Sequence, residues 1–122
     1  MTIVFFSNDL MFQSRMKSVV ERAGIQLIVA RKHDGFQSKL SEGEAPSLAV
    51  FDLSFRGINL ESAVAHLREQ YPAMKLIAYG PHVDVDALQQ ASDLGIDEVM
   101  TRGQFDRNLS AVLIPSSPDS RD

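Results

Sequence analysis

The sequence predicts an α/β protein, with a doubly wound five-stranded parallel sheet that carries helices on both faces. Short apolar segments rich in β-branched residues alternate with amphipathic helical segments five times along the chain. The apolar segments are apolar throughout, which is typical of strands that are covered on both faces. The chain has 122 residues, 44% hydrophobic and 23% charged, so we expect a single globular domain with one core.

The first two strand–helix repeats have clear boundaries. Ile3–Phe6 is a short apolar strand, and Met11–Ala23 is predicted to be helical because its apolar side chains recur at spacings of three and four. Gly24 ends this helix, since glycine favours the position after a helix C-terminus. Ile25–Ala30 is the second strand, and a weaker helix is expected over Asp34–Ser41.

The last three repeats are also bounded by cap and turn residues. Asn59 caps one helix at its N-terminus, and Tyr71-Pro72 ends that helix. Gly80-Pro81 breaks a strand, and Gly95 stops the helix that follows. The strands are expected at Ser47–Leu53, Leu76–Tyr79 and Glu98–Thr101, and the helices at Leu60–Gln70, Asp84–Leu94 and Gln104–Leu113.

Composition limits the possible functions. Residues 1–114 are expected to form the domain, with 115–122 as a polar tail or the start of a linker. The chain has no cysteine, which excludes disulfides and a catalytic thiol and suits the reducing cytoplasm. A net charge of −4 offers no basic footprint for nucleic acid, and no apolar run is long enough to span a membrane. We therefore expect a cytoplasmic protein that contacts neither nucleic acid nor a membrane.

The candidate site residues lie where the predicted strands end. In an open parallel sheet, ligands bind beyond the carboxyl ends of the strands. Ser7 and Asn8 could also serve only as helix N-caps, and Asp9 suits a helix N-terminus through its negative charge. The residues at these strand ends are Ser7, Asn8 and Asp9 after the first strand, Asp52 at the end of the third, Gly80 after the fourth and Arg102 after the fifth.

Nucleotide and histidine–metal sites are not indicated. The sequence has neither GxGxxG after the first strand nor GxxxxGK[ST], and the first turn, SNDLMFQS, lacks a glycine that would let the backbone approach a phosphate. His33, His66 and His82 are far apart in the sequence, so no shared metal site is expected from them.

Two segments carry a resemblance to a known family. FDLSFRG resembles the phospho-acceptor segment of the response-regulator receiver family. ALQQASDLGIDEVMTRGQF resembles that family's fourth helix, fifth strand and start of the fifth helix. The resemblance covers about residues 2–113. It implies a flavodoxin-like sheet of strand order 2-1-3-4-5, with Asp52 at the phospho-acceptor position.

The resemblance also implies that most of the family's phosphorylation residues are replaced. Family members hold magnesium with an acidic pair, add a lysine cation and use a hydroxyl and an aromatic residue as switch positions. Carried onto this sequence, the acidic pair falls on Ser7 and Asn8, and the lysine on Arg102. The hydroxyl falls on Gly80 and the aromatic on Val99, so only the acceptor aspartate is unchanged.

The physical consequence is a weak metal site. Magnesium prefers charged oxygen ligands, so a neutral pair holds it poorly, and any metal would depend on Asp9, Asp52 and the Ser54 carbonyl. Arg102 keeps its positive charge at any accessible pH and can pair with a carboxylate through two hydrogen bonds. We therefore hypothesise that Arg102 clamps Asp52 permanently.

These observations favour a pseudo-receiver: a binding module without enzymatic activity or cofactor, which signals through protein–protein contacts. Its partner would be a sensor kinase, a downstream signalling protein or a second copy of the chain. The alternative is a working response regulator in a phosphorelay, phosphorylated on Asp52 with magnesium; a small hydrolase or transferase is a third class without a clear nucleophile–base pair. The expected contact face is formed by 84–94, 98–101 and 104–113, with Val85, Gln89, Gln90, Asp93, Thr101, Phe105 and Arg107 as candidate contacts.

Overall fold

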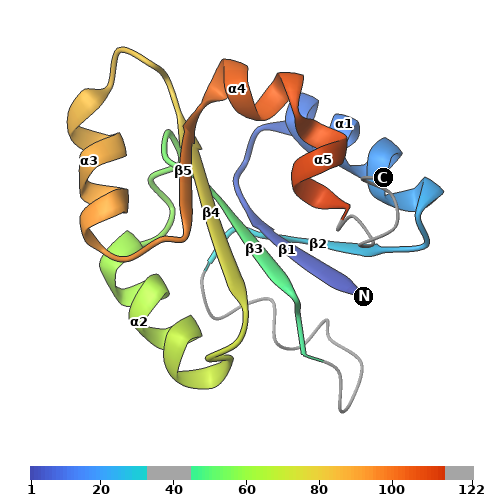
Figure 1. The fold of residues 1–122 in the computed structure, drawn as a ribbon, viewed down its shortest axis with the longest axis horizontal. Coiled ribbons are helices and arrows are strands. Elements are labelled where there is room, and N and C mark those ends of the chain that lie inside the picture. The colour runs from blue at the N-terminus through green and yellow to red at the C-terminus, as the bar shows by residue number, and fades with distance from the viewer. Residues whose placement is uncertain (33–44, 115–122) are drawn as a thin grey trace, which may run out of the picture.

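The computed structural model describes residues 1–32 and 45–114. Its strands form one parallel sheet of order β2-β1-β3-β4-β5 (Figure 1). The predicted fold class and strand order are therefore confirmed, and each strand boundary lies within one residue of its expected position. The strands are β1 Thr2–Phe6, β2 Gln26–Ala30, β3 Leu48–Asp52, β4 Lys75–Gly80 and β5 Glu98–Thr101.

The helices cover both faces of the sheet. On one face lie α1 (Leu10–Arg22), α4 (Arg102–Arg107) and α5 (Leu109–Leu113). On the other face lie α2 (Leu60–Gln70) and α3 (Val85–Asp93) (Figure 1). The sheet is therefore the middle of three layers, which is the arrangement that the uninterrupted apolar runs predict.

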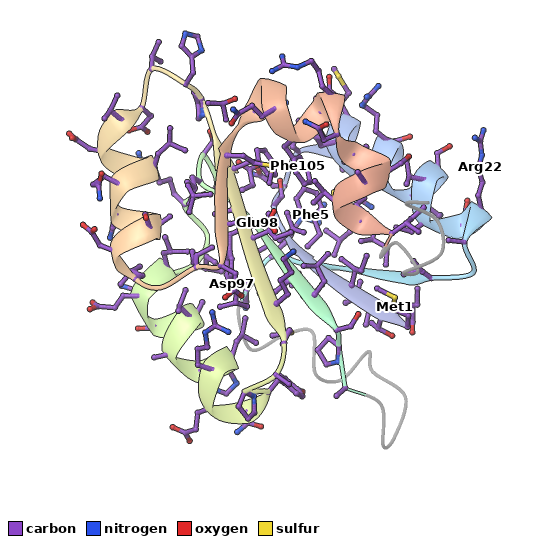
Figure 2. All side chains as sticks on the ribbon, viewed as in Figure 1. Met1, Phe5, Arg22, Asp97, Glu98 and Phe105 are labelled. Carbon is purple, nitrogen blue, oxygen red and sulfur yellow. The ribbon has the colours of Figure 1, made fainter. Side chains whose placement is uncertain are left out.

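Strand β1 shows why a strand that is covered on both faces is apolar throughout. Successive side chains of a strand point to opposite faces. Ile3 and Phe5 pack with α1 and the last helices, whereas Val4 and Phe6 pack with α2 and α3. Figure 2 shows Phe5 and Phe105 in the interior between the sheet and the helices. No position in β1 faces water, so alternation between polar and apolar residues is absent.

Local caps set the helix boundaries. Asp9 is the N-cap of α1 and accepts a hydrogen bond from the Phe12 N–H at 3.1 Å, so the interpretation of Ser7 and Asn8 as caps is wrong. Gly24 follows the helix with a φ of 72°, as predicted for a C-terminal stop. Asn59 caps α2 by accepting from the Ser62 N–H at 2.9 Å, as predicted.

The final helix differs from its prediction. One helix was expected over Gln104–Leu113, but the structure has two, divided at Asn108. Thr101 and Gln104 form a capping box that starts α4 two residues early. The Asn108 side chain donates to the Gln104 carbonyl at 2.8 Å, and such local bonds compete with the helical pattern. The buried residues of the two helices are Phe105, Leu109 and Leu113.

Some expectations fall on residues outside the described ranges. The helix expected over Asp34–Ser41, the side chain of His33 and the tail 115–122 all lie there. Among the described helices, none combines the length and apolar character needed to cross a membrane.

A polar clamp joins α2 to the amino-terminal ends of β4 and β5. Arg68 donates to the Met74 carbonyl at 3.0 Å and to the Gly95 carbonyl at 2.9 Å. Its guanidinium also pairs with Asp97 at 3.1 Å, and Asp97, labelled in Figure 2, accepts from the Leu76 N–H at 2.8 Å. Partial burial raises the pKa of Asp97, but the Leu76 N–H and Arg68 outweigh burial and hold this pKa below its ordinary value.

We expect Asp97→Asn to lower the free energy of unfolding by about 0.5–1 kcal/mol at neutral pH, because the ion pair is partly exposed. The folded-state pKa lies below the unfolded value of about 3.9, so the stabilisation is complete above about pH 5. This stabilisation is lost as the pH falls below about 4, where the free energies of unfolding of the wild type and the variant should converge. Urea unfolding from pH 3 to pH 7 measures this difference, with the exposed Glu69→Gln as the matched control. A difference that is independent of pH would contradict the prediction.

Candidate functional site

The candidate site residues gather at the carboxyl ends of the strands. Because the strands are parallel and in register, Asp52 pairs with Tyr79 across β3 and β4, and Gly80 pairs with Thr101 across β4 and β5. Ser7 directly follows β1, which lies beside β3. The predicted grouping of these positions at one edge of the sheet is therefore observed.

Asp52 is buried, and each of its carboxylate oxygens accepts a hydrogen bond. Only 6% of Asp52 is exposed, and Ser7 is completely buried. The Ser7 hydroxyl donates to Asp52 Oδ2 at 2.6 Å, and the Ser54 backbone N–H donates to Oδ1 at 2.9 Å. Ser7 Oγ in turn accepts from the Asp9 N–H at 2.9 Å. Each carboxylate oxygen of Asp52 thus has a donor from within the chain.

The hypothesis that Arg102 clamps Asp52 is wrong. Arg102 Nη2 lies 2.6 Å from Asp9 Oδ2, and its guanidinium carbon lies 4.6 Å from the centroid of the Phe12 ring. The reason lies in the start of α1. Its N-cap is Asp9, whose carboxylate pairs with Arg102, whereas Asp52 Oδ2 is already bound to Ser7.

Mutual stabilisation keeps Asp9 and Arg102 charged. The Phe12 N–H and the Arg102 guanidinium outweigh partial burial and hold the pKa of Asp9 below its ordinary value. The hydrogen bond to Asp9 raises the pKa of Arg102 above its ordinary value. Stacking of the guanidinium on Phe12 adds a cation–π contact. Arg102 is therefore engaged by Asp9 and Phe12.

The described residues do not form a set that suits magnesium. No group of three or more histidine, cysteine, aspartate or glutamate side chains comes together within residues 1–32 and 45–114. Asp9 uses one oxygen for the Phe12 N–H and the other for Arg102, and both oxygens of Asp52 have donors. A cation here would have to share these oxygens with their donors and lie near the Arg102 guanidinium, whose positive charge opposes magnesium binding.

The other positions that the family resemblance assigned, Gly80, Val99 and Asn8, carry no hydroxyl, aromatic or acidic side chain. Gly80 ends β4, and a Cβ placed there would lie 3.1 Å from Leu53 Cβ and 3.3 Å from Leu53 Cδ1, so a hydroxyl-bearing residue would crowd Leu53. Val99 is partly buried against the core on the α2–α3 face. Asn8 is exposed to solvent.

Sequence reasoning missed Tyr79. This residue is completely buried, and its ring stacks on Phe105 at a centroid distance of 4.5 Å. Burial raises the pKa of the Tyr79 hydroxyl, the nearby Asp52 carboxylate raises it further, and Ser7 lowers it slightly. In the described part of the chain the buried hydroxyl makes no hydrogen bond of good geometry. A tyrosine one residue before the end of a strand was the available signal, but the apolar run LIAYG suggested only core.

We expect Tyr79→Phe to raise the free energy of unfolding by about 1 kcal/mol. The change keeps the ring stack and removes a buried hydroxyl without a partner, which costs about 1–3 kcal/mol when left unpaired. Thermal and urea unfolding measure the effect. Tyr71→Phe, at the partly buried second tyrosine, is the matched control and should bring no such gain. A loss of stability for Tyr79→Phe would instead show that water or Ser7 satisfies the hydroxyl.

The expected contact face is only partly available. Val85 is 66% exposed, and Gln89, Gln90, Asp93 and Arg107 are exposed as well. Phe105 is completely buried, so its expected role as a surface contact is wrong. Thr101 is partly exposed, but its hydroxyl caps α4.

Known proteins match this chain in structure but not in sequence. No protein-family model matches the sequence, and no curated protein is detectably similar to it. A response regulator receiver domain protein from Clostridium thermocellum is 16% identical with a TM-score of 0.71, covering 92% of this chain and 90% of that chain. The receiver domain of NtrX from Brucella abortus is 14% identical with a TM-score of 0.68, covering 95% of this chain and 100% of that chain.

A third match is a response regulator from Burkholderia pseudomallei with a phosphorylated aspartic acid, a calcium ion and citrate. It is 17% identical with a TM-score of 0.70, covering 98% of this chain and 70% of that chain. At these identities the likeness shows the fold alone. The chain therefore has the fold of receiver domains, as the sequence predicts.

Proposed function

We propose that this domain is a pseudo-receiver that acts in signal transduction through protein–protein contacts, without conventional magnesium-dependent phosphorylation. The receiver fold supports a signalling role, because structures with this fold include response regulators. The observation that carries the proposal is the buried hydrogen bond from the Ser7 hydroxyl to the Asp52 carboxylate.

The bond matters because of what phosphorylation requires. A carboxylate oxygen must attack phosphorus to form an acyl phosphate, and cations must neutralise the incoming charge. Each oxygen of Asp52 already accepts one hydrogen bond, from Ser7 or from the Ser54 N–H, and these bonds lower the reactivity of the carboxylate. Arg102 is committed to Asp9, so phosphoryl transfer would have to break two local interactions without a metal to offset the cost.

Signalling would then depend on the surface of the domain. We place the contact face on α3, β5, α4 and α5, where Val85 is an exposed apolar residue and Val83 just precedes it with 76% exposure. The proposed partner is a sensor kinase, a downstream signalling protein or a second copy of this chain. A cytoplasmic location, the absence of a cofactor and the absence of enzymatic activity belong to the same proposal.

Acetyl phosphate with magnesium, followed by intact-mass measurement, tests the proposal. We expect no phosphoryl adduct on the wild-type chain under conditions that fully label an ordinary receiver domain measured in parallel. Asp52→Asn serves as the matched control for background modification, and Asp9→Asn tests whether Asp9 holds magnesium. Stoichiometric labelling that disappears in Asp52→Asn would overturn the proposal in favour of a working phospho-acceptor response regulator, and a parallel loss in Asp9→Asn would support magnesium held by Asp9, Asp52 and the Ser54 carbonyl.

A further inference from the structure

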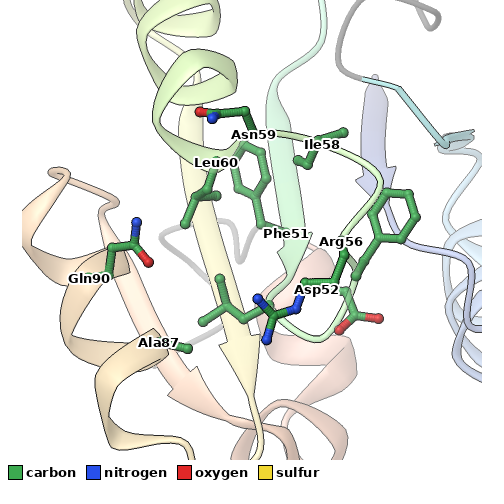
Figure 3. A pocket seen from close by; sticks show the side chains of 10 residues that line it. Phe51, Asp52, Arg56, Ile58, Asn59, Leu60, Ala87 and Gln90 are labelled. Atoms are coloured by element: carbon green, nitrogen blue, oxygen red, sulfur yellow. The ribbon is translucent and has the colours of Figure 1, made fainter.

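A cavity of about 230 Å³ lies between the β3–α2 loop and α3 (Figure 3). Six of its ten lining residues are apolar, and its polar groups come from one carboxylate, one guanidinium and two amides. Asp52 is among these residues, so the cavity adjoins the candidate site. The lining residues are Phe51, Asp52, Leu53, Phe55, Arg56, Ile58, Asn59, Leu60, Ala87 and Gln90.

The loop that forms one wall is held at both ends. At its start, the Phe55 N–H donates to the Asp52 carbonyl at 3.0 Å. At its end, Asn59 caps α2. Between these points the Phe55 ring lies directly over Gly57, where a Cβ would come within 2.2 Å of the ring. Any side chain at position 57 would push the Phe55 ring away, so this packing requires glycine.

Arg56 supplies an uncommitted positive charge. Within residues 1–32 and 45–114 its side chain forms no ion pair or hydrogen bond, in contrast to Arg68 and Arg102. Figure 3 shows its guanidinium reaching from the loop toward α3, while the carboxylate of Asp52 is directed away from it. The N-terminus of α2 borders the same cavity and adds partial positive charge. Arg56 and this end of α2 are therefore the groups of the cavity on which an anion would bind.

We propose that the cavity binds a small organic acid, with the acid group on Arg56 and an apolar body between Phe51, Ile58, Leu60 and Ala87. Ligand sites combine apolar walls with a few polar groups that fix orientation, and drug-sized ligands need about 300–1,000 Å³. A cavity of about 230 Å³ suits a smaller ligand, of roughly ten non-hydrogen atoms. Binding beside α3 would give the domain an input other than phosphorylation, which goes beyond the function proposed above.

Phenylpropionate is the probe, with its uncharged amide, phenylpropionamide, as the comparison ligand. We expect saturable chemical-shift changes in two-dimensional amide NMR spectra, confined to residues 51–60 and 87–90. Arg56→Gln should weaken binding by about tenfold, the loss of one charge-assisted hydrogen bond. Arg22→Gln, at the exposed end of α1 (Figure 2), is the matched control and should bind as the wild type does.

Ala87→Leu tests the cavity independently of charge, because its longer side chain would occupy the space for the apolar body. We expect it to abolish saturable binding. Arg56 is on the surface, so Arg56→Gln keeps the test decisive even if Ala87→Leu does not fold. Equal binding of the amide, unchanged binding by Arg56→Gln, or shifts outside the cavity would overturn the proposal. None of these outcomes depends on whether Asp52 accepts a phosphoryl group, so this proposal and the pseudo-receiver proposal fail separately.

Discussion

Replacing Phe105 by alanine is expected to lower the free energy of unfolding by about 3–5 kcal/mol, the usual cost of removing a buried phenyl ring. Phe105 is completely buried and stacks on Tyr79 with an interplanar angle of 5°. Its ring also lies 5.6 Å from that of Phe12 in α1. The change therefore removes the aromatic contact that joins α4 to both the sheet and the first helix.

Arg102 also ties α4 to Asp9 and Phe12, but it adds no buried apolar side chain. Phe105 is the single buried residue of this six-residue helix. The ion pair between Arg15 and Asp106 also links α1 to α4, but both side chains are about half exposed, so the pair contributes little. A helix this short is unstable without tertiary packing. Loss of Phe105 should therefore also release α4 locally.

Chemical denaturation at neutral pH measures the global effect, and amide hydrogen exchange in 102–107 measures the local one. Phe105→Leu keeps much of the apolar volume and should cost much less than Phe105→Ala. Val83→Ala, at an exposed apolar residue, should change stability by less than about 0.5 kcal/mol. A cost below about 1 kcal/mol for Phe105→Ala would show that α4 does not depend on the core.

The fold was predictable because its signals are local. A completely buried strand such as β1 is almost entirely apolar. A helix such as α2 carries both its buried apolar side chains and its Asn59 cap within a dozen residues. The division of the last helix at Asn108 was not predictable in the same way. There a favourable capping box at Thr101 and a side-chain bond from Asn108 compete with an apolar stripe that continues through both helices.

The location of the candidate site was predictable, but its pairings were not. Parallel strands end at one edge of a sheet, so Ser7, Asp52 and Arg102 had to lie near one another. The carboxylate that pairs with Arg102 depends on which residue caps the N-terminus of α1. A shift of that cap by one residue would change the ion pair. The Arg102–Asp9 and Ser7–Asp52 bonds join residues that are 93 and 45 positions apart. No pattern within a short window encodes such a choice.

The cavity beside α3 shows a further limit of sequence reasoning. This cavity results from how the end of β3, one loop and two helices pack, and no local sequence pattern encodes that arrangement. The packing of Phe55 over Gly57 required coordinates. Tyr79 was missed for a related reason, because a buried tyrosine in an apolar strand has the same pattern as any core residue.

The Ser7–Asp52 bond should be measurable as a coupling energy. Ser7→Ala is expected to lower the free energy of unfolding by about 1.5–3 kcal/mol, because it leaves a buried carboxylate oxygen without its donor. Asp52→Ala removes the carboxylate and leaves the Ser7 hydroxyl without its acceptor. If the two groups stabilise each other, the double variant should lower the free energy of unfolding by less than the sum of the two single changes.

Urea unfolding of the wild type, both single variants and the double variant completes this cycle, with a coupling of about 1–2 kcal/mol as the expected result. Ser54→Ala is the matched control: Ser54 reaches Asp52 through its backbone N–H, which alanine retains, so stability should change by less than about 0.5 kcal/mol. A coupling near zero would mean that Ser7 does not hold the carboxylate, and Asp52 would then be free to accept a phosphoryl group. A strong coupling means that modification of Asp52 must first break a bond on which the folded state depends. Such an energetic cost would support the proposal that the domain is a pseudo-receiver.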